Sequence, residues 1–155
     1  MNGKTLIATC SLLMVAAVSA VLYGQDAFAP QAAAPDITVY KDPQCGCCGK
    51  WIEHLRRSGF SVAARNETRM DRIKSARGVP ARLASCHTAV VGGYVIEGHV
   101  PADAIKRLLR ERPPISGLAV PGMPMGAPGM EGPRTDRYEI ASFGPDGKIG
   151  VYERR

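Results

Sequence analysis

The chain has 155 residues, which is the length of one domain with appendages and is too short for two full hydrophobic cores. Its formal net charge is +6, from 20 basic and 14 acidic side chains. Basic and acidic residues are interleaved, and no long basic run or basic stripe with aromatic platforms occurs. The charge pattern therefore predicts a solvated surface and argues against a nucleic-acid partner.

The first 29 residues have the form of an export signal. Lys4 is followed by an apolar run from Leu6 to about Leu22, and small residues at 18–20 and at 27–29 offer two cleavage positions. We predict a cleaved signal peptide and export to the periplasm of a Gram-negative bacterium. An uncleaved anchor is the alternative, because the run is at the short edge of what spans a bilayer. Contact with a membrane is expected only through this segment.

An Ala/Pro linker over residues 30–36 leads into the first predicted elements. Residues 37–40 are typical of a short strand, and apolar residues at three- and four-residue spacing after Cys45 predict an amphipathic helix that ends at Gly59. Extended structure resumes over 60–62, which gives a β-α-β opening.

The following segment predicts a helix, two strands and a last helix. Residues 70–77 favour a short polar helix, 81–91 and 94–97 favour antiparallel strands joined at Gly92-Gly93, and 102–110 favour an amphipathic helix. The order βαβαββα over residues 37–112 resembles a thioredoxin-like α/β domain, in which cysteines lie at a helix amino terminus and a Val-Pro pair opens a neighbouring strand. That analogy implies a cis peptide before Pro80, with an ordinary trans turn as the alternative.

Four cysteines follow the signal, and three of them lie within four residues: Cys45, Cys47, Cys48, with Cys86 further along. At a helix amino terminus, unpaired N–H groups and the aligned peptide dipoles favour thiolate over thiol. Thiolates select copper(I), which accepts two or three sulfurs, and one Cys-x-Cys-Cys loop can offer them. Four-cysteine zinc sites usually use two separated Cys-x-x-Cys pairs, so zinc fits less well. We predict a copper(I) site.

Two other interpretations of these cysteines remain open. Cys45 and Cys48 have the spacing of a thiol-disulfide oxidoreductase, with either as nucleophile, and such an enzyme could also act on the redox state of copper. An oxidising compartment also permits a disulfide-stabilised interaction module with no free thiol and no metal. Cys47 discriminates between the first two functions, since disulfide exchange does not need it and copper binding does.

Residues 117–130 form a second group, called here the methionine segment. It is too rich in Pro and Gly for the interior of a helix or strand, so we expect an irregular arm. Met123, Met125 and Met130 follow no period that would bury them, and thioether sulfur is a soft copper(I) ligand. They are candidate ligands or a lid, with packing against the domain as the alternative.

The three histidines are not equally good candidates for metal ligands. His54 falls on the predicted solvent face of the cysteine helix and is left out of the site. His87 follows Cys86 directly, and neighbouring side chains in a strand point to opposite faces, so Cys86 is preferred unless the strand is broken there. His99 lies in a turn before the last helix. It is a candidate for a peripheral ligand, with a polar loop residue as the alternative.

Separated blocks of the chain, in order from about Ile37 to Tyr152, resemble the CopG family of periplasmic copper-resistance proteins, long catalogued as a domain of unknown function. The blocks are Val39 to Cys48 with Trp51 and His54-Leu55, then Gly78-Val79-Pro80, Ser85 to Ala89, Gly93 to Ala102, and Gly117 to Pro124. The resemblance implies a thioredoxin-like fold and a copper cluster held by Cys45, Cys47 and Cys48, with Cys86 completing the thiolate set. If each thiolate bridges two ions, the four could hold about four copper(I).

The carboxyl-terminal residues predict a β-hairpin. Residues 138–143 and 149–152 flank Gly144-Pro145-Asp146-Gly147, a strong turn sequence. We expect residues 113–155 to form a methionine-rich arm and hairpin packed on the same domain. The function predicted is copper(I) binding for copper resistance, as a buffer or as a chaperone that serves a periplasmic efflux or oxidase protein.

Overall fold

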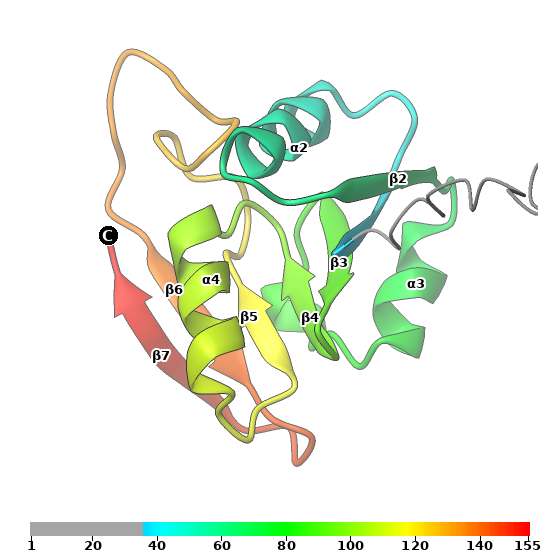
Figure 1. Cartoon of the computed structure of the whole chain (residues 1–155), viewed down its shortest axis with the longest axis vertical. Helices are drawn as coiled ribbons and strands as arrows, with labels where there is room; N and C mark the ends of the chain where they lie inside the picture. Colours follow the sequence, from blue (N-terminus) through cyan, green and yellow to red (C-terminus); the bar gives the residue numbers. More distant parts are fainter. Residues whose placement is uncertain (1–35) are drawn as a thin grey trace, which may run out of the picture. The chain divides into compact units, whose positions relative to one another are not determined.

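The computed structural model describes residues 36–155 (Figure 1). The predicted export signal and nearly all of the linker lie outside these residues. Within residues 36–155, no helix has the length and apolar composition needed to cross a bilayer.

In the described part of the chain, seven strands form one mixed sheet in the order β2-β1-β3-β4-β5-β6-β7. The elements follow along the chain as β1 (Ile37–Lys41), α2 (Gly46–Arg57), β2 (Val62–Asn66), α3 (Met70–Ala76), a 3-10 turn (Ala81–Leu83), β3 (His87–Val91), β4 (Tyr94–Glu97), α4 (Ala102–Glu111), β5 (Gly117–Ala119), β6 (Glu139–Phe143) and β7 (Ile149–Arg154). The α/β class and the order βαβαββα are therefore as predicted.

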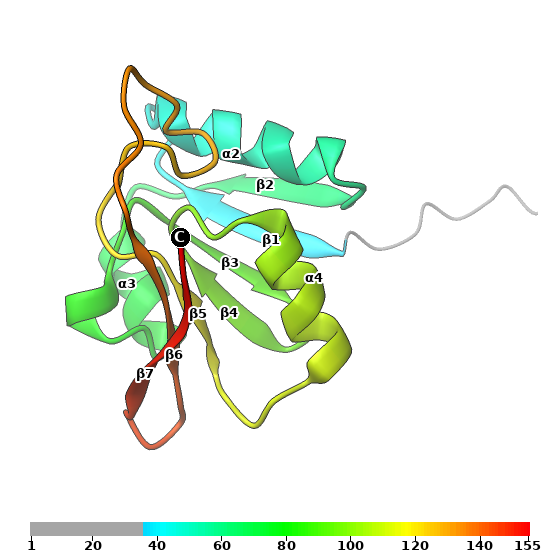
Figure 2. The ribbon, with the colours of Figure 1, turned by 90° about the vertical axis from the view of Figure 1, so that its left-hand side faces the viewer.

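The helices α2 and α4 share one hydrophobic core with the sheet. β1 pairs in parallel with β2 and antiparallel with β3, so the strand that delivers the cysteine loop lies inside the sheet. Trp51 and Leu55 of α2 and Ile105 and Leu108 of α4 are fully buried against apolar residues of β1, β3, β4, β5 and β6. Figure 2 shows α3 on the other side of the sheet from α4. This packing holds the first turn of α2 rigidly over one end of the sheet.

The predicted carboxyl-terminal hairpin is β6–β7, and it extends the sheet beyond β5. Its turn is closed by the Gly144 N–H, which donates to the Lys148 carbonyl at 2.9 Å, and Gly147 adopts a positive φ of 75°. Only glycine takes this φ without strain, which explains the turn sequence.

Two expectations from the sequence are wrong, and the choice left open at Pro80 is decided. The residues 81–91 do not form one strand: a 3-10 turn occupies Ala81–Leu83 and β3 begins only at His87. The peptide before Pro80 is trans, because no cis peptide occurs among residues 36–155. The methionine segment is not irregular throughout, since Gly117–Ala119 forms β5, parallel to β4. Gly117 permits this pairing, because a Cβ there would lie too close to the Val95 carbonyl.

Candidate metal centre

The cysteine loop connects β1 to α2 through a tight turn. The Asp42 carboxylate accepts the Gln44 N–H at 2.8 Å, and the Asp42 carbonyl accepts the Cys45 N–H at 3.1 Å. Cys45 is the N-cap of α2, and no side chain caps the helix or places an acidic group in its first turn. The positive end of the helix therefore faces the sulfurs of the loop.

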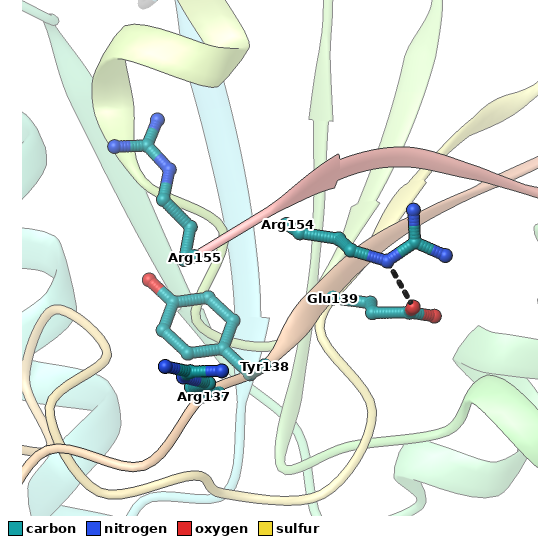
Figure 3. Close-up of a pocket in the computed structure, with 5 residues that line it drawn as sticks. All are labelled: Arg137, Tyr138, Glu139, Arg154 and Arg155. Carbon is teal, nitrogen blue, oxygen red and sulfur yellow. Dashed lines mark hydrogen bonds and ion pairs between the residues drawn. The ribbon is translucent and has the colours of Figure 1, made fainter.

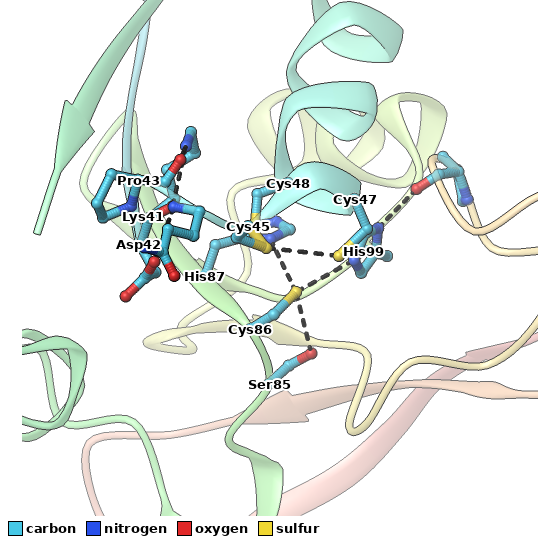
Figure 4. Close-up of a disulfide and its surroundings, with 12 residues drawn as sticks. Lys41, Asp42, Pro43, Cys45, Cys47, Cys48, Ser85, Cys86, His87 and His99 are labelled. Carbon is cyan, nitrogen blue, oxygen red and sulfur yellow. Dashed lines mark hydrogen bonds between the residues drawn. A yellow bond between two sulfur atoms is a disulfide. The ribbon is translucent and has the colours of Figure 1, made fainter. Parts of the chain in front are cut away.

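The four cysteines predicted as ligands come together at this end of α2 (Figure 4). Cys45 and Cys48 form a disulfide, while Cys47 and Cys86 are free thiols. The Sγ atoms of Cys45 and Cys47 are 3.5 Å apart, and all four sulfurs lie within 4.8 Å of one another. Cys86 reaches the group from the loop before β3, so residues about 40 positions apart in the sequence share one small volume.

Two histidines adjoin the sulfurs, and one of them was left out of the predicted site. The Cys86 Sγ lies 3.2 Å from His87 Nδ1 and 3.1 Å from His99 Nε2, so Cys86, His87 and His99 form a second possible ligand group. His87 was set aside on the assumption of a continuous strand through Cys86. Because β3 begins at His87, Cys86 belongs to the preceding loop and both side chains reach the same place.

His87 is a fully buried imidazole in contact with Trp51. The two rings have centroids 4.3 Å apart, and the Trp51 indole N–H donates to the Val100 carbonyl at 2.9 Å. Burial, together with the nearby His99 and Lys74, lowers the pKa of His87 to about 3. Its Nε2 has no hydrogen-bond partner within the described residues. The nitrogen that faces the Cys86 sulfur is Nδ1, and a neutral buried imidazole is the form of histidine that binds a metal.

The ring of His99 is oriented by the methionine segment. Its Nδ1 lies 2.7 Å from the Pro128 carbonyl, which can only accept, so Nδ1 carries the proton and the Nε2 lone pair faces Cys86. Burial lowers the pKa of His99, although the Pro128 hydrogen bond opposes this shift. His99 is thus a buried residue of the cluster rather than a solvated loop residue.

The Cys86 thiol is protonated at neutral pH. Burial and the neighbouring Cys47 together raise its pKa to about 11, while the Ser85 hydroxyl opposes the shift. Thiolate is the form that binds metal, so a metal ion bound by Cys86 displaces a proton.

His54 has a structural role. Its Nε2 accepts the Ala102 N–H at 3.1 Å, which satisfies a free donor at the first turn of α4. The expectation that His54 faces solvent is wrong, because the ring is half-buried between α2 and α4 and burial lowers its pKa. It does not belong to either cluster of candidate ligands.

The three methionines of the methionine segment line an open pocket of about 390 Å³ beside Cys47. The pocket is formed by Gly46, Cys47, Lys50, Met123, Met125, Gly129, Met130 and Glu131. Met123 is 56% exposed, which is unusual for a large apolar side chain. Gly129 lies against the backbone of α2, where a Cβ would be 2.8 Å from the Trp51 nitrogen. The segment is therefore seated on the helix that carries the cysteines.

A further pocket lies at the carboxyl-terminal hairpin and offers different chemistry (Figure 3). It is lined by Arg137, Tyr138, Glu139, Arg154 and Arg155, and Arg154 pairs with Glu139 at 2.9 Å. With no sulfur or imidazole in its lining, it is no part of the candidate metal centre.

The fold and site define a class: a small α/β protein with a partly buried cysteine–histidine cluster suited to a soft metal. The comparisons agree with this class. A family model described as "Protein of unknown function, DUF411" matches residues 83–130, which include Cys86, His87, His99 and the three methionines. No curated protein matches the chain.

Two solved structures of copper resistance protein CopG are similar to the chain over most of its length. Form 2 is 45% identical, with a TM-score of 0.75, and the alignment covers 79% of this chain and 99% of that one. Form 1 is 47% identical, with a TM-score of 0.73, and the coverage is 77% and 95%. The chain belongs to the CopG family of copper-resistance proteins.

Proposed function

We propose that this protein binds copper(I) in the periplasm and thereby contributes to copper resistance. The ligands would be the thiolates of Cys45, Cys47, Cys48 and Cys86. The observation that supports this most strongly is the convergence of four cysteine sulfurs within 4.8 Å of one another, on a helix end and a loop that the core holds in place. Soft sulfur donors favour copper(I) over harder cations.

The residues around the sulfurs fit the same metal. Neither candidate ligand group contains a carboxylate, and His87 and His99 are held neutral by burial. His99 is proposed as a ligand through Nε2, and His87 joins it as a ligand that the sequence did not suggest. Met123, Met125 and Met130 are proposed as thioether ligands or as the entry point next to Cys47.

Copper binding by all four cysteines requires the Cys45–Cys48 disulfide to be reduced. A dithiol that gives up two electrons and becomes a disulfide would provide two more thiolates, and if each thiolate bridges two ions, the four could hold about four copper(I). The oxidised protein retains Cys47, Cys86 and the two imidazoles, so the redox state of the pair would set the capacity of the site.

The experiment is an anaerobic titration of the reduced full-length chain with copper(I), in competition with a chromophoric chelator. The wild type should take up several copper ions per chain. Cys47→Ser should lose most of this capacity, and Met70→Leu, a methionine outside both ligand groups, should match the wild type. A wild type that takes up a single ion, or that prefers zinc(II) in a parallel titration, would contradict the multinuclear copper site.

A second function is favoured by the disulfide itself. Cys45 and Cys48 are bonded at the start of α2, where a Cys-x-x-Cys pair of a thiol-disulfide oxidoreductase would lie. In that function a substrate dithiol would reduce the disulfide and become oxidised in turn. Cys47→Ser should leave this exchange intact while it removes copper binding, so one variant separates the two functions. An efflux or oxidase protein of the periplasm is the proposed partner in either case.

A further inference from the structure

A buried ion pair between Glu97 and Lys74 contacts the loop that carries the candidate ligand Cys86. Glu97, at the end of β4, has a fully buried side chain, and its Oε1 accepts from Lys74 Nζ at 2.5 Å. The same oxygen accepts the Ser85 backbone N–H at 2.6 Å, and Oε2 accepts the Thr88 hydroxyl at 2.7 Å. Lys74 comes from α3, none of whose residues is buried. The carboxylate thus has three donors, from three different parts of the chain.

These contacts reach the ligands through the backbone. Ser85 immediately precedes Cys86, and its hydroxyl donates to the Gly122 carbonyl in the methionine segment. Gly98 lies between Glu97 and His99, and a Cβ there would be 2.6 Å from the Ser85 Oγ. The loop of Cys86 and the turn of His99 are therefore in close contact, and Cys86 Sγ lies 3.1 Å from His99 Nε2.

Stability alone does not explain such a pair. The desolvation free energy of two charges in a protein interior is about as large as the free energy of their attraction. A protein with well-packed apolar residues in place of such a pair is therefore often as stable or more stable. Around metal sites, residues that hold the ligands commonly matter for affinity without touching the metal. The Ser85 N–H is the contact that connects the ion pair to the loop of Cys86.

We propose that Glu97 is a positioning residue for the copper site: its carboxylate, with Lys74 as counter-ion, fixes the Ser85 backbone and so holds Cys86 against His99. This inference rests on the proposed copper-binding function for its role, but the positioning itself is a property of the metal-free chain. The proposal gives α3 a function, because this helix supplies Lys74 although none of its residues is buried.

Two double variants of the full-length chain test the proposal. Lys74→Met with Glu97→Gln removes both charges and keeps an acceptor for the Ser85 N–H. Lys74→Met with Glu97→Met removes the charges and the acceptor together. Each is measured for its unfolding temperature, for copper(I) affinity by chelator competition, and for the alkylation rate of Cys86 in the metal-free oxidised protein, read by mass spectrometry of its peptide.

The glutamine pair should bind copper within about threefold of the wild type. The methionine pair should bind about 10- to 100-fold more weakly, the usual effect of losing a residue that holds a metal ligand, and Cys86 should be alkylated faster while the protein is still folded. Equal copper affinity and equal Cys86 alkylation in the two pairs would overturn the proposal. If the methionine pair does not fold, Lys74→Met with Glu97→Asn, whose uncharged amide is one methylene shorter and cannot reach the Ser85 N–H as the glutamine does, provides the same comparison.

The alkylation rates keep this inference separate from the proposed function. A wild type that binds no copper would refute copper binding, whereas the difference in Cys86 alkylation between the two pairs would still confirm or refute the positioning by Glu97.

Discussion

Acidification should destabilise the metal-free protein through His87. The ring is fully buried, and its pKa is lowered to about 3, whereas the same histidine in the unfolded chain has its ordinary value near 6.5. As the pH falls below the unfolded value, only the unfolded state takes up this proton, so stability present at neutral pH is lost progressively until the folded pKa is reached. For one such histidine the loss between about pH 7.5 and pH 4.5 is about 2.7 kcal/mol.

The assay is urea unfolding at several pH values, followed by circular dichroism with a metal chelator present. Two other histidines also titrate in this window, because burial lowers the pKa of His54 and of His99. The informative quantity is therefore the free energy of unfolding of the wild type minus that of His87→Gln, which should change by about 2.7 kcal/mol over the range. Two curves that stay parallel would refute the assignment of a buried, neutral His87.

Three further predictions concern the surroundings of the site. Gly129→Ala should destabilise the protein and weaken copper binding, because its Cβ would collide with the Trp51 backbone. Gly122→Ala, also at positive φ but in open space, should cost only about 1 kcal/mol in thermal unfolding. Equal effects of the two substitutions would contradict the packing of the methionine segment on α2. Trp51→Phe should lower the free energy of unfolding by about 1 kcal/mol or more, since the Val100 carbonyl loses its buried donor, and denaturant titration measures this. Copper(I) added to the reduced protein in weak buffer should release about one proton more from the wild type than from Cys86→Ser, because the pKa of Cys86 is raised to about 11. Equal proton release would show that Cys86 does not bind copper.

Much of the fold could be predicted because local patterns and tertiary packing agree. In α2, the residues predicted at helical spacing on the apolar face are buried, Trp51 and Leu55 among them, and only Cys47 is partly exposed. The Gly-Gly pair at 92–93 and the Gly-Pro-Asp-Gly turn at 144–147 join neighbouring antiparallel strands, whose register depends on local turn chemistry. The cysteine cluster was also predictable, since three of its members lie within four residues of the sequence.

The rest depends on contacts between distant residues. The place of His87 follows from the start of β3, and the only local signal was that residues 81–85 lack the β-branched side chains of a strand. β5 is short and gains its stability from pairing with β4 and β6, which no pattern of three residues reveals. The Glu97–Lys74 pair joins positions 23 residues apart, and a lone Glu at a strand end reads as a surface residue.

The central claim is that the cysteine cluster of this chain binds copper(I) through sulfur. The most direct test is copper K-edge X-ray absorption, with elemental analysis, on full-length protein purified anaerobically from copper-supplemented cells, beside Cys47→Ser prepared in the same way. The account predicts several coppers per chain in the wild type, with the edge of copper(I) and a first shell dominated by sulfur, and loss of most of this copper from the variant. Copper absent from the wild type, or bound equally by the variant in a shell of nitrogen and oxygen, would contradict it.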